Sequence, residues 1–191
     1  MNFDILKLLI KQKANVNALN LKGNTPLSLV CGNEILDFES IQFLVENNAQ
    51  LNLINTEGNL QKKTVSALHK LCANKKINLK VIEYLVEKKS NLNCPDLSNS
   101  IITNNTPLHY ACQNHYTNHQ VIHYLIKKKA DFNLQNTHTQ IKNSHLTPLQ
   151  LALSNIKLVE QIQKVYGKGV QEFFEQCQKE ESLENDICFI L

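Results

Sequence analysis

Apolar residues recur along this chain in short runs at helical spacing. In one set of runs they fall at i, i+3 and i+4, as Leu27, Val30 and Cys31 do, which is typical of a helix with one buried face. Each run follows a threonine or serine, in three copies with proline next. A hydroxyl side chain accepts a hydrogen bond from a free backbone N–H at the start of a helix. Proline has no backbone N–H, and it fits the first turn because an N–H there would have no partner within the helix. The pattern therefore predicts four short helices, opening at Thr25, Ser66, Thr106 and Thr147.

A second set of apolar runs lies between the first. It predicts second helices near residues 3–13, 40–48, 80–89 and 120–129. Successive openings of the first helices are 41, 40 and 41 residues apart, which is the length scale of a stacked repeat. We therefore expect an all-α solenoid of helix-turn-helix units over residues 1–166. The first unit lacks its first helix, so the chain begins with a half-repeat or the sequence is a fragment.

The repeated phrases resemble the ankyrin repeat. Residues 106–111 read Thr-Pro-Leu-His-Tyr-Ala, like the family opening, and residues 14–17 read Ala-Asn-Val-Asn, like its closing phrase. The resemblance implies a solenoid of four to five ankyrin repeats. The period exceeds the usual length of about 33 residues, so a HEAT-type repeat remains the alternative, on length alone. Most of the excess falls in elongated finger loops, at residues 53–65, 94–105 and 134–146.

The C-terminal region differs from the repeats. Two glycines break the last second helix, and the apolar pattern that follows predicts a capping helix over residues 167–181. A flexible acidic tail is expected over residues 182–191. Residues 1–170 carry 19 lysines against 11 acids, whereas residues 171–191 carry one lysine against six acids. The sequence thus predicts an acidic appendage on a basic body.

The choice of basic residues and of cysteines limits the class of partner and the cellular compartment that we expect. All 20 basic residues are lysine, so the planar guanidinium that reads guanine and phosphate is missing, and we expect no nucleic-acid partner. Cys31, Cys72 and Cys112 occupy equivalent places in successive copies. Thiols repeated in register indicate core packing, not a disulfide framework. A reducing, cytoplasmic compartment follows, and we expect a monomer.

Catalytic and metal-binding chemistry has little support. His115, His119 and His123 are four residues apart, but the alignment puts residues 114–120 in a loop between helices, so no zinc site is expected. Cys94 is the only cysteine in a finger, and no base, glycine-rich elbow or phosphate loop accompanies it. We therefore expect no cofactor, no metal and no enzyme activity, with a cysteine-dependent enzyme as a remote alternative.

The last four residues, Cys188-Phe189-Ile190-Leu191, have the C-a-a-X form that eukaryotic prenyltransferases modify, and leucine in the last place indicates geranylgeranyl. An accidental apolar tail and a C-terminal ligand for a PDZ-type groove are the alternatives. Lipidation at Cys188 would make the chain a membrane-tethered, host-directed effector adaptor in host cytosol or at a host membrane.

The family resemblance implies a protein-protein interaction module that binds through its finger loops and the concave face of its first helices. His69 and His109 match the histidine of the family opening, whose ring bonds the backbone of the turn. The positions expected to contact a partner protein are Asn24, Asn33, Lys62, Lys63, Asn74, Asn105, Gln113 and Asn114.

Overall fold

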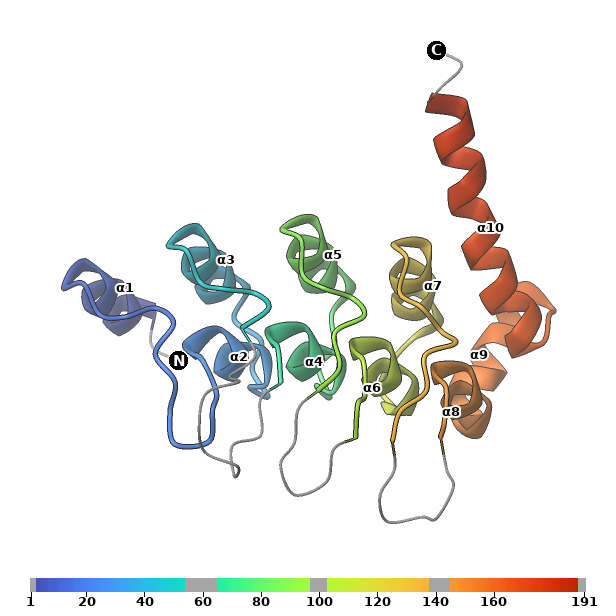
Figure 1. Cartoon of the computed structure of the whole chain (residues 1–191), viewed down its shortest axis with the longest axis horizontal. Helices are drawn as coiled ribbons and strands as arrows, with labels where there is room; N and C mark the ends of the chain where they lie inside the picture. Colours follow the sequence, from blue (N-terminus) through green and yellow to red (C-terminus); the bar gives the residue numbers. More distant parts are fainter. Residues whose placement is uncertain (1–2, 54–64, 97–102, 138–144, 189–191) are drawn as a thin grey trace.

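The computed structural model describes residues 3–53, 65–96, 103–137 and 145–188, with side chains up to residue 179. Within these ranges the only regular elements are helices, which confirms the all-α prediction (Figure 1). The first helices of the units are α2 (Pro26–Cys31), α4 (Ala67–Cys72), α6 (Pro107–Gln113) and α8 (Pro148–Ser154). The second helices are α1 (Phe3–Lys11), α3 (Phe38–Glu46), α5 (Leu79–Glu87) and α7 (His119–Lys127), followed by α9 (Ile156–Tyr166) and α10 (Val170–Cys188).

The first helices begin where the hydroxyl residues predicted. The Thr25 hydroxyl oxygen accepts the backbone N–H of Ser28 at 3.1 Å, and Pro26 fills the first helical position. The same arrangement opens α8, where Thr147 Oγ1 accepts the N–H of Gln150 at 3.3 Å. These caps satisfy donors that the first turn of a helix leaves free.

Each of the four second helices ends two residues before its predicted end. The cause is a change of backbone conformation at the second residue after the helix, where φ becomes positive in every unit. A residue with positive φ closes the helix because its N–H then bonds back to the last turn. Lysine or asparagine holds this position: Lys13 (62°), Asn48 (65°), Lys89 (69°) and Lys129 (71°).

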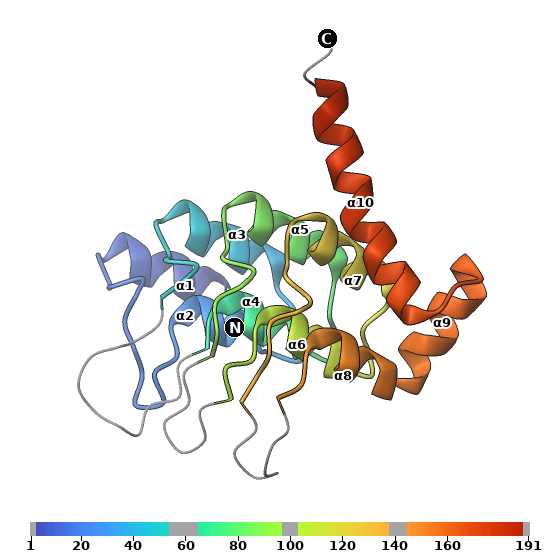
Figure 2. The same ribbon diagram turned by 45° about the vertical axis from the view of Figure 1, so that its right-hand side comes forward.

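The helices form two layers. The first helices α2, α4, α6 and α8 stand in one row, and α1, α3, α5 and α7 form a second row above them (Figures 1 and 2). A continuous core runs between the rows, and Leu27, Leu68 and Leu108 are fully buried in it. Leu149, in the same place of the last first helix, is only partly buried, because the row of first helices ends there.

Asparagine side chains join neighbouring units in two ladders. In the first ladder, the Asn74 amide donates to the carbonyls of Cys31 (2.8 Å) and Asn33 (2.7 Å) in the unit before it. Asn114 and Asn155 repeat this contact one and two units later. The second ladder uses the closing asparagines Asn17, Asn52 and Asn93, each of which bonds one backbone N–H and one carbonyl in the unit that follows.

The C-terminal region closes the stack differently from the inner units. Only Asn155 separates α8 from α9, and α10 then packs its first turns on α7, α8 and α9. Phe173 and Phe174 are buried there, and the Phe174 ring lies edge-on to Phe132 at 5.4 Å between centroids. The capping helix predicted over residues 167–181 begins at Val170, and α10 continues to Cys188, into the residues that were predicted to form the tail over 182–191. Residues 170–188 contain no glycine or proline and are rich in glutamate and glutamine, which favour helix.

Candidate partner-binding surface

The bases of the fingers are held by short backbone pairs. The N–H of Asp96 donates to the carbonyl of Asn105 at 2.8 Å, and that of Asn136 donates to Leu146 at 2.9 Å. Neighbouring fingers also bond to each other, since Thr137 N–H donates to the Thr103 carbonyl at 2.8 Å. The described bases of these two fingers therefore have fixed places on the side of the first helices (Figure 1).

A buried carboxylate, that of Asp96, organises the base of the finger at residues 94–105. Asp96 has no exposed surface, and its oxygens accept hydrogen bonds from the Thr103 hydroxyl (2.7 Å), the Asn105 N–H (2.8 Å) and the Tyr110 hydroxyl (2.6 Å). Burial, together with the bond to Asp96, raises the pKa of Tyr110. A buried charge is tolerated when it is fully hydrogen-bonded, so this cluster fixes the finger to α6.

Two histidines each link the base of one finger to the first helix of the preceding unit. His69 Nδ1 accepts the N–H of Ser66 at 3.2 Å, and Nε2 lies 3.0 Å from the carbonyl of Asn105 and donates to it. His109 makes the same pair of bonds, to Thr106 and to Leu146. Burial lowers the pKa of His69 to about 4, so the ring is neutral at physiological pH. Both histidines serve the scaffold and are closed to a partner.

A shallow hollow opens on this side of the molecule, between the first turn and helices α2 and α4. Its volume is about 520 Å³. Two leucines form its apolar part: Leu21, at the tip of the short turn, is 92% exposed, and Leu29, on α2, is 45% exposed. Lys22 and Lys70 flank them. An exposed apolar patch with charged edges is the composition of a protein-binding site.

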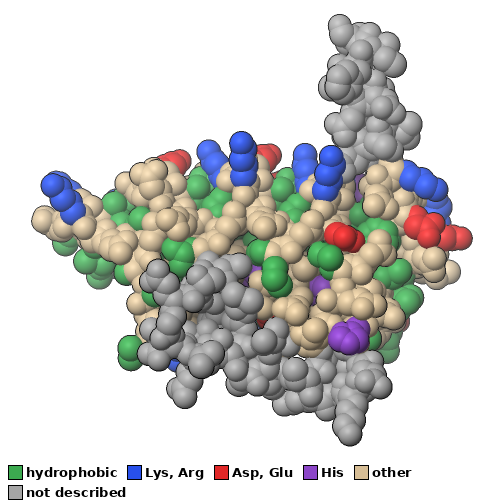
Figure 3. All heavy atoms as spheres, in the orientation of Figure 1, with side chains coloured by type: hydrophobic (Ala, Val, Ile, Leu, Met, Phe, Trp, Pro, Cys, Tyr) green, Lys and Arg blue, Asp and Glu red, His purple; other side chains and the backbone are tan. Residues whose placement is uncertain are grey.

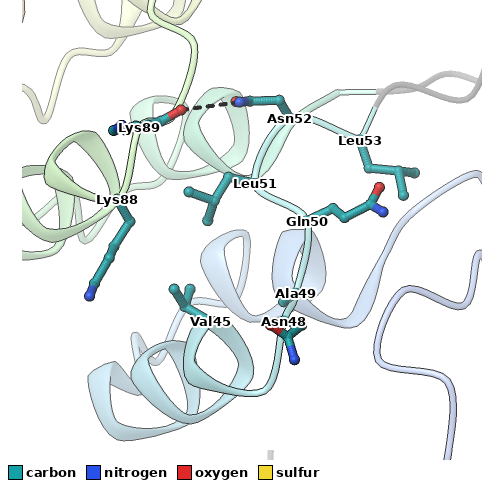
Figure 4. Close-up of a pocket in the computed structure, with 9 residues that line it drawn as sticks. All are labelled: Val45, Asn48, Ala49, Gln50, Leu51, Asn52, Leu53, Lys88 and Lys89. Carbon is teal, nitrogen blue, oxygen red and sulfur yellow. Dashed lines mark hydrogen bonds between the residues drawn. The ribbon is translucent and has the colours of Figure 1, made fainter.

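A second hollow, of about 720 Å³, lies at the ends of the second helices α3 and α5 (Figure 4). It runs along residues 48–53 and is bordered by Lys88 and Lys89. The closing asparagine Asn52 crosses it to donate to the Lys89 carbonyl at 3.1 Å. Much of its polar lining is thus already used to join two units, which leaves the leucine hollow as the better candidate.

The structure corrects several of the sequence-predicted contact residues. Asn24, Asn74 and Asn105 were expected to be exposed, and that expectation is wrong because each is buried. Asn24 closes the short turn with Asn20, Asn74 belongs to the first ladder, and Asn105 bonds Asp96. The Asn74 amide satisfies buried backbone carbonyls, whereas Asn24 and Asn105 are held through their own backbone N–H groups. An alignment of the copies does not reveal these needs.

The remaining predicted positions lie in different places. Asn114 is half-buried and joins two units through the first ladder. Asn33 and Gln113 are exposed at the ends of α2 and α6. Lys62 and Lys63 lie outside the described residues. The predicted residues therefore do not form one contiguous patch.

Sequence reasoning missed Leu21 and Leu29. Leu29 takes the fourth place of its helix, which holds Lys70, Tyr110 and Leu151 in later copies. A position that changes from leucine to lysine to tyrosine, while the position after it stays apolar, was a usable signal that Leu29 is exposed. Leu21 gave a weaker signal, as an apolar residue at the tip of a polar turn.

The cysteine and histidine candidates have structural explanations. Burial raises the pKa of the Cys94 thiol, whose sulfur donates to the Asn91 carbonyl at 3.2 Å; a thiol of this kind is a poor nucleophile. His119 was predicted in a loop, but α7 begins there because Asn118 caps the helix. The described part of the chain holds no cluster of three metal-ligating side chains.

The family relationship rests on this architecture and on comparison with known families. A family model for ankyrin repeats in three copies matches residues 1–96 and 49–136, which favours ankyrin over the HEAT-type alternative. A search of curated protein sequences found no match. Among the described helices, none has the length and apolar character needed to cross a bilayer. With paired helices, Thr-Pro-Leu openings and asparagine ladders in register, this chain belongs to the ankyrin-repeat family.

Proposed function

We propose that the chain binds a partner protein through the leucine hollow on the finger side of its first helices. Ankyrin repeats are typically protein-protein interaction modules and are generally non-catalytic. The observation that carries the proposal is the exposure of Leu21 and Leu29 side by side in one hollow. A few side chains that the partner buries near the centre of an interface supply most of its binding energy, and burying exposed leucine side chains is favourable.

Charge defines the partner further. Lys22 and Lys70 border the two leucines, so the complementary segment carries an apolar side chain between acidic residues. Opposite charges at the rim of an interface raise the association rate and fix its register. The binding mode is recognition of a folded or extended protein segment, without a small molecule or a metal.

The test is affinity capture with the full chain as bait, before and after Leu21→Asp. Because Leu21 is 92% exposed, the substitution leaves the fold intact and places a charge in the hollow. We expect the specifically captured protein to fall at least about tenfold, which corresponds to about 1.4 kcal/mol of binding free energy. Quantitative mass spectrometry of the captured proteins gives the measurement.

Ile35→Asp is the matched control, since Ile35 is also an exposed aliphatic residue (78%) but lies outside the leucine hollow, in the loop between α2 and α3. It should leave capture unchanged. Equal recovery of every captured protein on the wild-type, Leu21→Asp and Ile35→Asp baits would place the binding surface elsewhere.

A lipid tether at Cys188 is the second candidate function, and it rests on the C-a-a-X form of the last four residues. Helix α10 leads away from the repeats and ends at Cys188 (Figure 1). A lipid on this cysteine would therefore leave the leucine hollow facing away from a membrane. Residues 189–191 lie outside the described residues.

The tether is tested by expressing the chain, with Leu191 as its last residue, in eukaryotic cells. We expect the intact mass to change by the gain of one geranylgeranyl group and the loss of the three last residues, which together lower it, and Cys188→Ser to abolish the change. A single lipid gives only marginal membrane binding, so fractionation should show partial membrane association. An unmodified wild-type mass would rule out the tether and leave the binding module.

A further inference from the structure

Helix α8 exposes a face that the equivalent helices of the earlier units bury. Leu153 on α8 is 54% exposed. The residues in the same place of α2, α4 and α6 are fully buried cysteines: Cys31, Cys72 and Cys112. Leu149, one turn before Leu153, is only partly buried, and Ile156 at the start of α9 is 70% exposed. This surface, formed by Leu149, Leu153 and Ile156, is called the α8 face below.

The exposure follows from the way the chain continues after α8. In the earlier units, the first helix of the next unit packs on this side, as α4 packs on α2 and α8 packs on α6. After α8, only Asn155 intervenes before α9 begins. Helices α9 and α10 also contact α8, but they leave Leu153 and Ile156 exposed. The α8 face is therefore open although the described chain runs on through two more helices.

The polar side chains beside the two leucines are used within their own helix. The Gln150 side-chain oxygen accepts the N–H of Thr147 at 2.8 Å, and the Ser154 hydroxyl donates to the Leu151 carbonyl at 2.7 Å. Figure 3 shows hydrophobic side chains at the right-hand edge of the molecule, where α8 and α9 lie in Figure 1. Outer units of a repeat stack normally turn a polar face to water. An apolar face in this place therefore indicates a surface that another surface covers.

The charges beside the α8 face favour a second copy of the chain as that covering surface. Lys157 and Glu160 are both exposed on α9, and they lie three residues apart and next to Ile156, on one side of the helix. A border with one lysine and one glutamate complements itself under a twofold rotation, because each lysine then meets the glutamate of the other copy. A partner with only acidic or only basic residues would be repelled by one of the two.

We propose that two copies of the chain form a dimer through their α8 faces, related by a twofold axis. The three aliphatic residues of each copy form the apolar centre of the contact, and Lys157 of one copy lies against Glu160 of the other. The same surface is used on both sides, so the contact closes after two copies and leaves no open end for a third. This differs from the monomer that we expected from the sequence.

The dimer has a consequence for the capture of a partner. The leucine hollow lies between the first turn and helices α2 and α4, away from α8 along the row of first helices (Figure 1). The contact therefore leaves both hollows open, and the dimer presents two of them. A partner with two matching segments binds the second hollow intramolecularly, which raises the total affinity. The dimer itself does not depend on the function proposed for the hollow.

The experiment is sedimentation equilibrium of the purified full chain over a wide range of concentrations. We expect the weight-average mass to rise with concentration toward twice the mass of the monomer and to stop there. Leu153→Asp places a charge at the centre of the face and should raise the dissociation constant at least tenfold. Because Leu153 is 54% exposed, circular dichroism should show an unchanged helix content. A wild-type chain that stays monomeric at every concentration, or that grows past a dimer, would overturn the proposal.

Two charge-reversed variants, mixed at low salt so that surface charges are not screened, test the twofold geometry. Lys157→Glu puts glutamate against glutamate across the contact, and Glu160→Lys puts lysine against lysine. Each variant alone should dimerise at least about fivefold more weakly, because two attractive pairs become repulsive. In an equal mixture, both cross pairs are again of opposite charge, so heterodimers should form as tightly as the wild-type dimer. A mixture that associates no better than its two components would contradict the twofold contact.

Two control variants complete the design. Leu21→Asp changes the exposed leucine of the hollow (92%), and Val165→Asp changes an exposed residue of α9 (55%) outside the α8 face. Both should dimerise as the wild type does. A weaker dimer in either variant would show that exposed apolar area in general, and not the α8 face, drives the association. Because Leu21→Asp tests the hollow and Leu153→Asp tests the α8 face, the failure of one proposal is distinguishable from the failure of the other.

Discussion

At the scale of single residues, the buried histidines make the stability of this chain depend on pH. His69 is almost fully buried, and its pKa falls to about 4 because burial disfavours the charged ring. Burial also lowers the pKa of His109. In the unfolded chain both titrate near pH 6.5. Between these values the unfolded state binds protons that the folded state does not, so stability falls as the pH falls from about 6.5 toward 4.

We expect His69 to contribute on the order of 3 kcal/mol to this loss, at about 1.4 kcal/mol for each pH unit, and His109 to add to it. Urea unfolding at a series of pH values between 7 and 4.5 measures the effect. The chain supplies its own control, because Gln150 holds the same place in α8 and accepts the N–H of Thr147 at 2.8 Å. Replacing both histidines by glutamine should flatten the profile, and an unchanged slope would contradict the assignment.

At the scale of elements, sequence pattern located the helices well and their ends less well. The hydroxyl caps Thr25, Ser66 and Thr147 mark helix starts because capping is a local interaction of a few adjacent residues. The ends of the second helices depend on a positive φ at lysine or asparagine. Neither residue type by itself predicts that conformation, which is uncommon outside glycine. The predicted ends therefore lie two residues beyond the observed ones.

The candidate site was harder to predict than the helices. The sequence prediction treated Asn74 and Asn114 as exposed residues, yet they bond carbonyls about 40 positions earlier in the chain. Such long-range contacts leave no trace in local periodicity. The leucine hollow was difficult to predict for the same reason, since Leu21 and Leu29 come together with Lys70 only when two units stack. Alignment of the repeats identified the equivalent positions, but it did not show which of them are buried or hydrogen-bonded between neighbouring units.

At the scale of the whole molecule, stability is the sum of the units and of the contacts between neighbours. The apolar seams supply most of the neighbour contact, and the asparagine ladders fix its register. Both ladders end where the stack ends, so equivalent residues have different energetic roles at its ends and in its interior. Asn33 and Asn114 are one such pair, because they hold the same place at the ends of α2 and α6.

Substituting these two asparagines separates the ladder from the local turn. Each accepts one backbone N–H in its own loop, from Ile35 or from Tyr116, but only Asn114 also donates to carbonyls of the unit before it, at 2.9 and 2.8 Å. At about 1 kcal/mol for each hydrogen bond, Asn114→Ala should lower the free energy of unfolding by roughly 2 kcal/mol more than Asn33→Ala. Urea denaturation with a common slope measures the difference. Equal losses for the two variants would mean that the seams alone hold the units in register, and that the asparagines serve only their own turns.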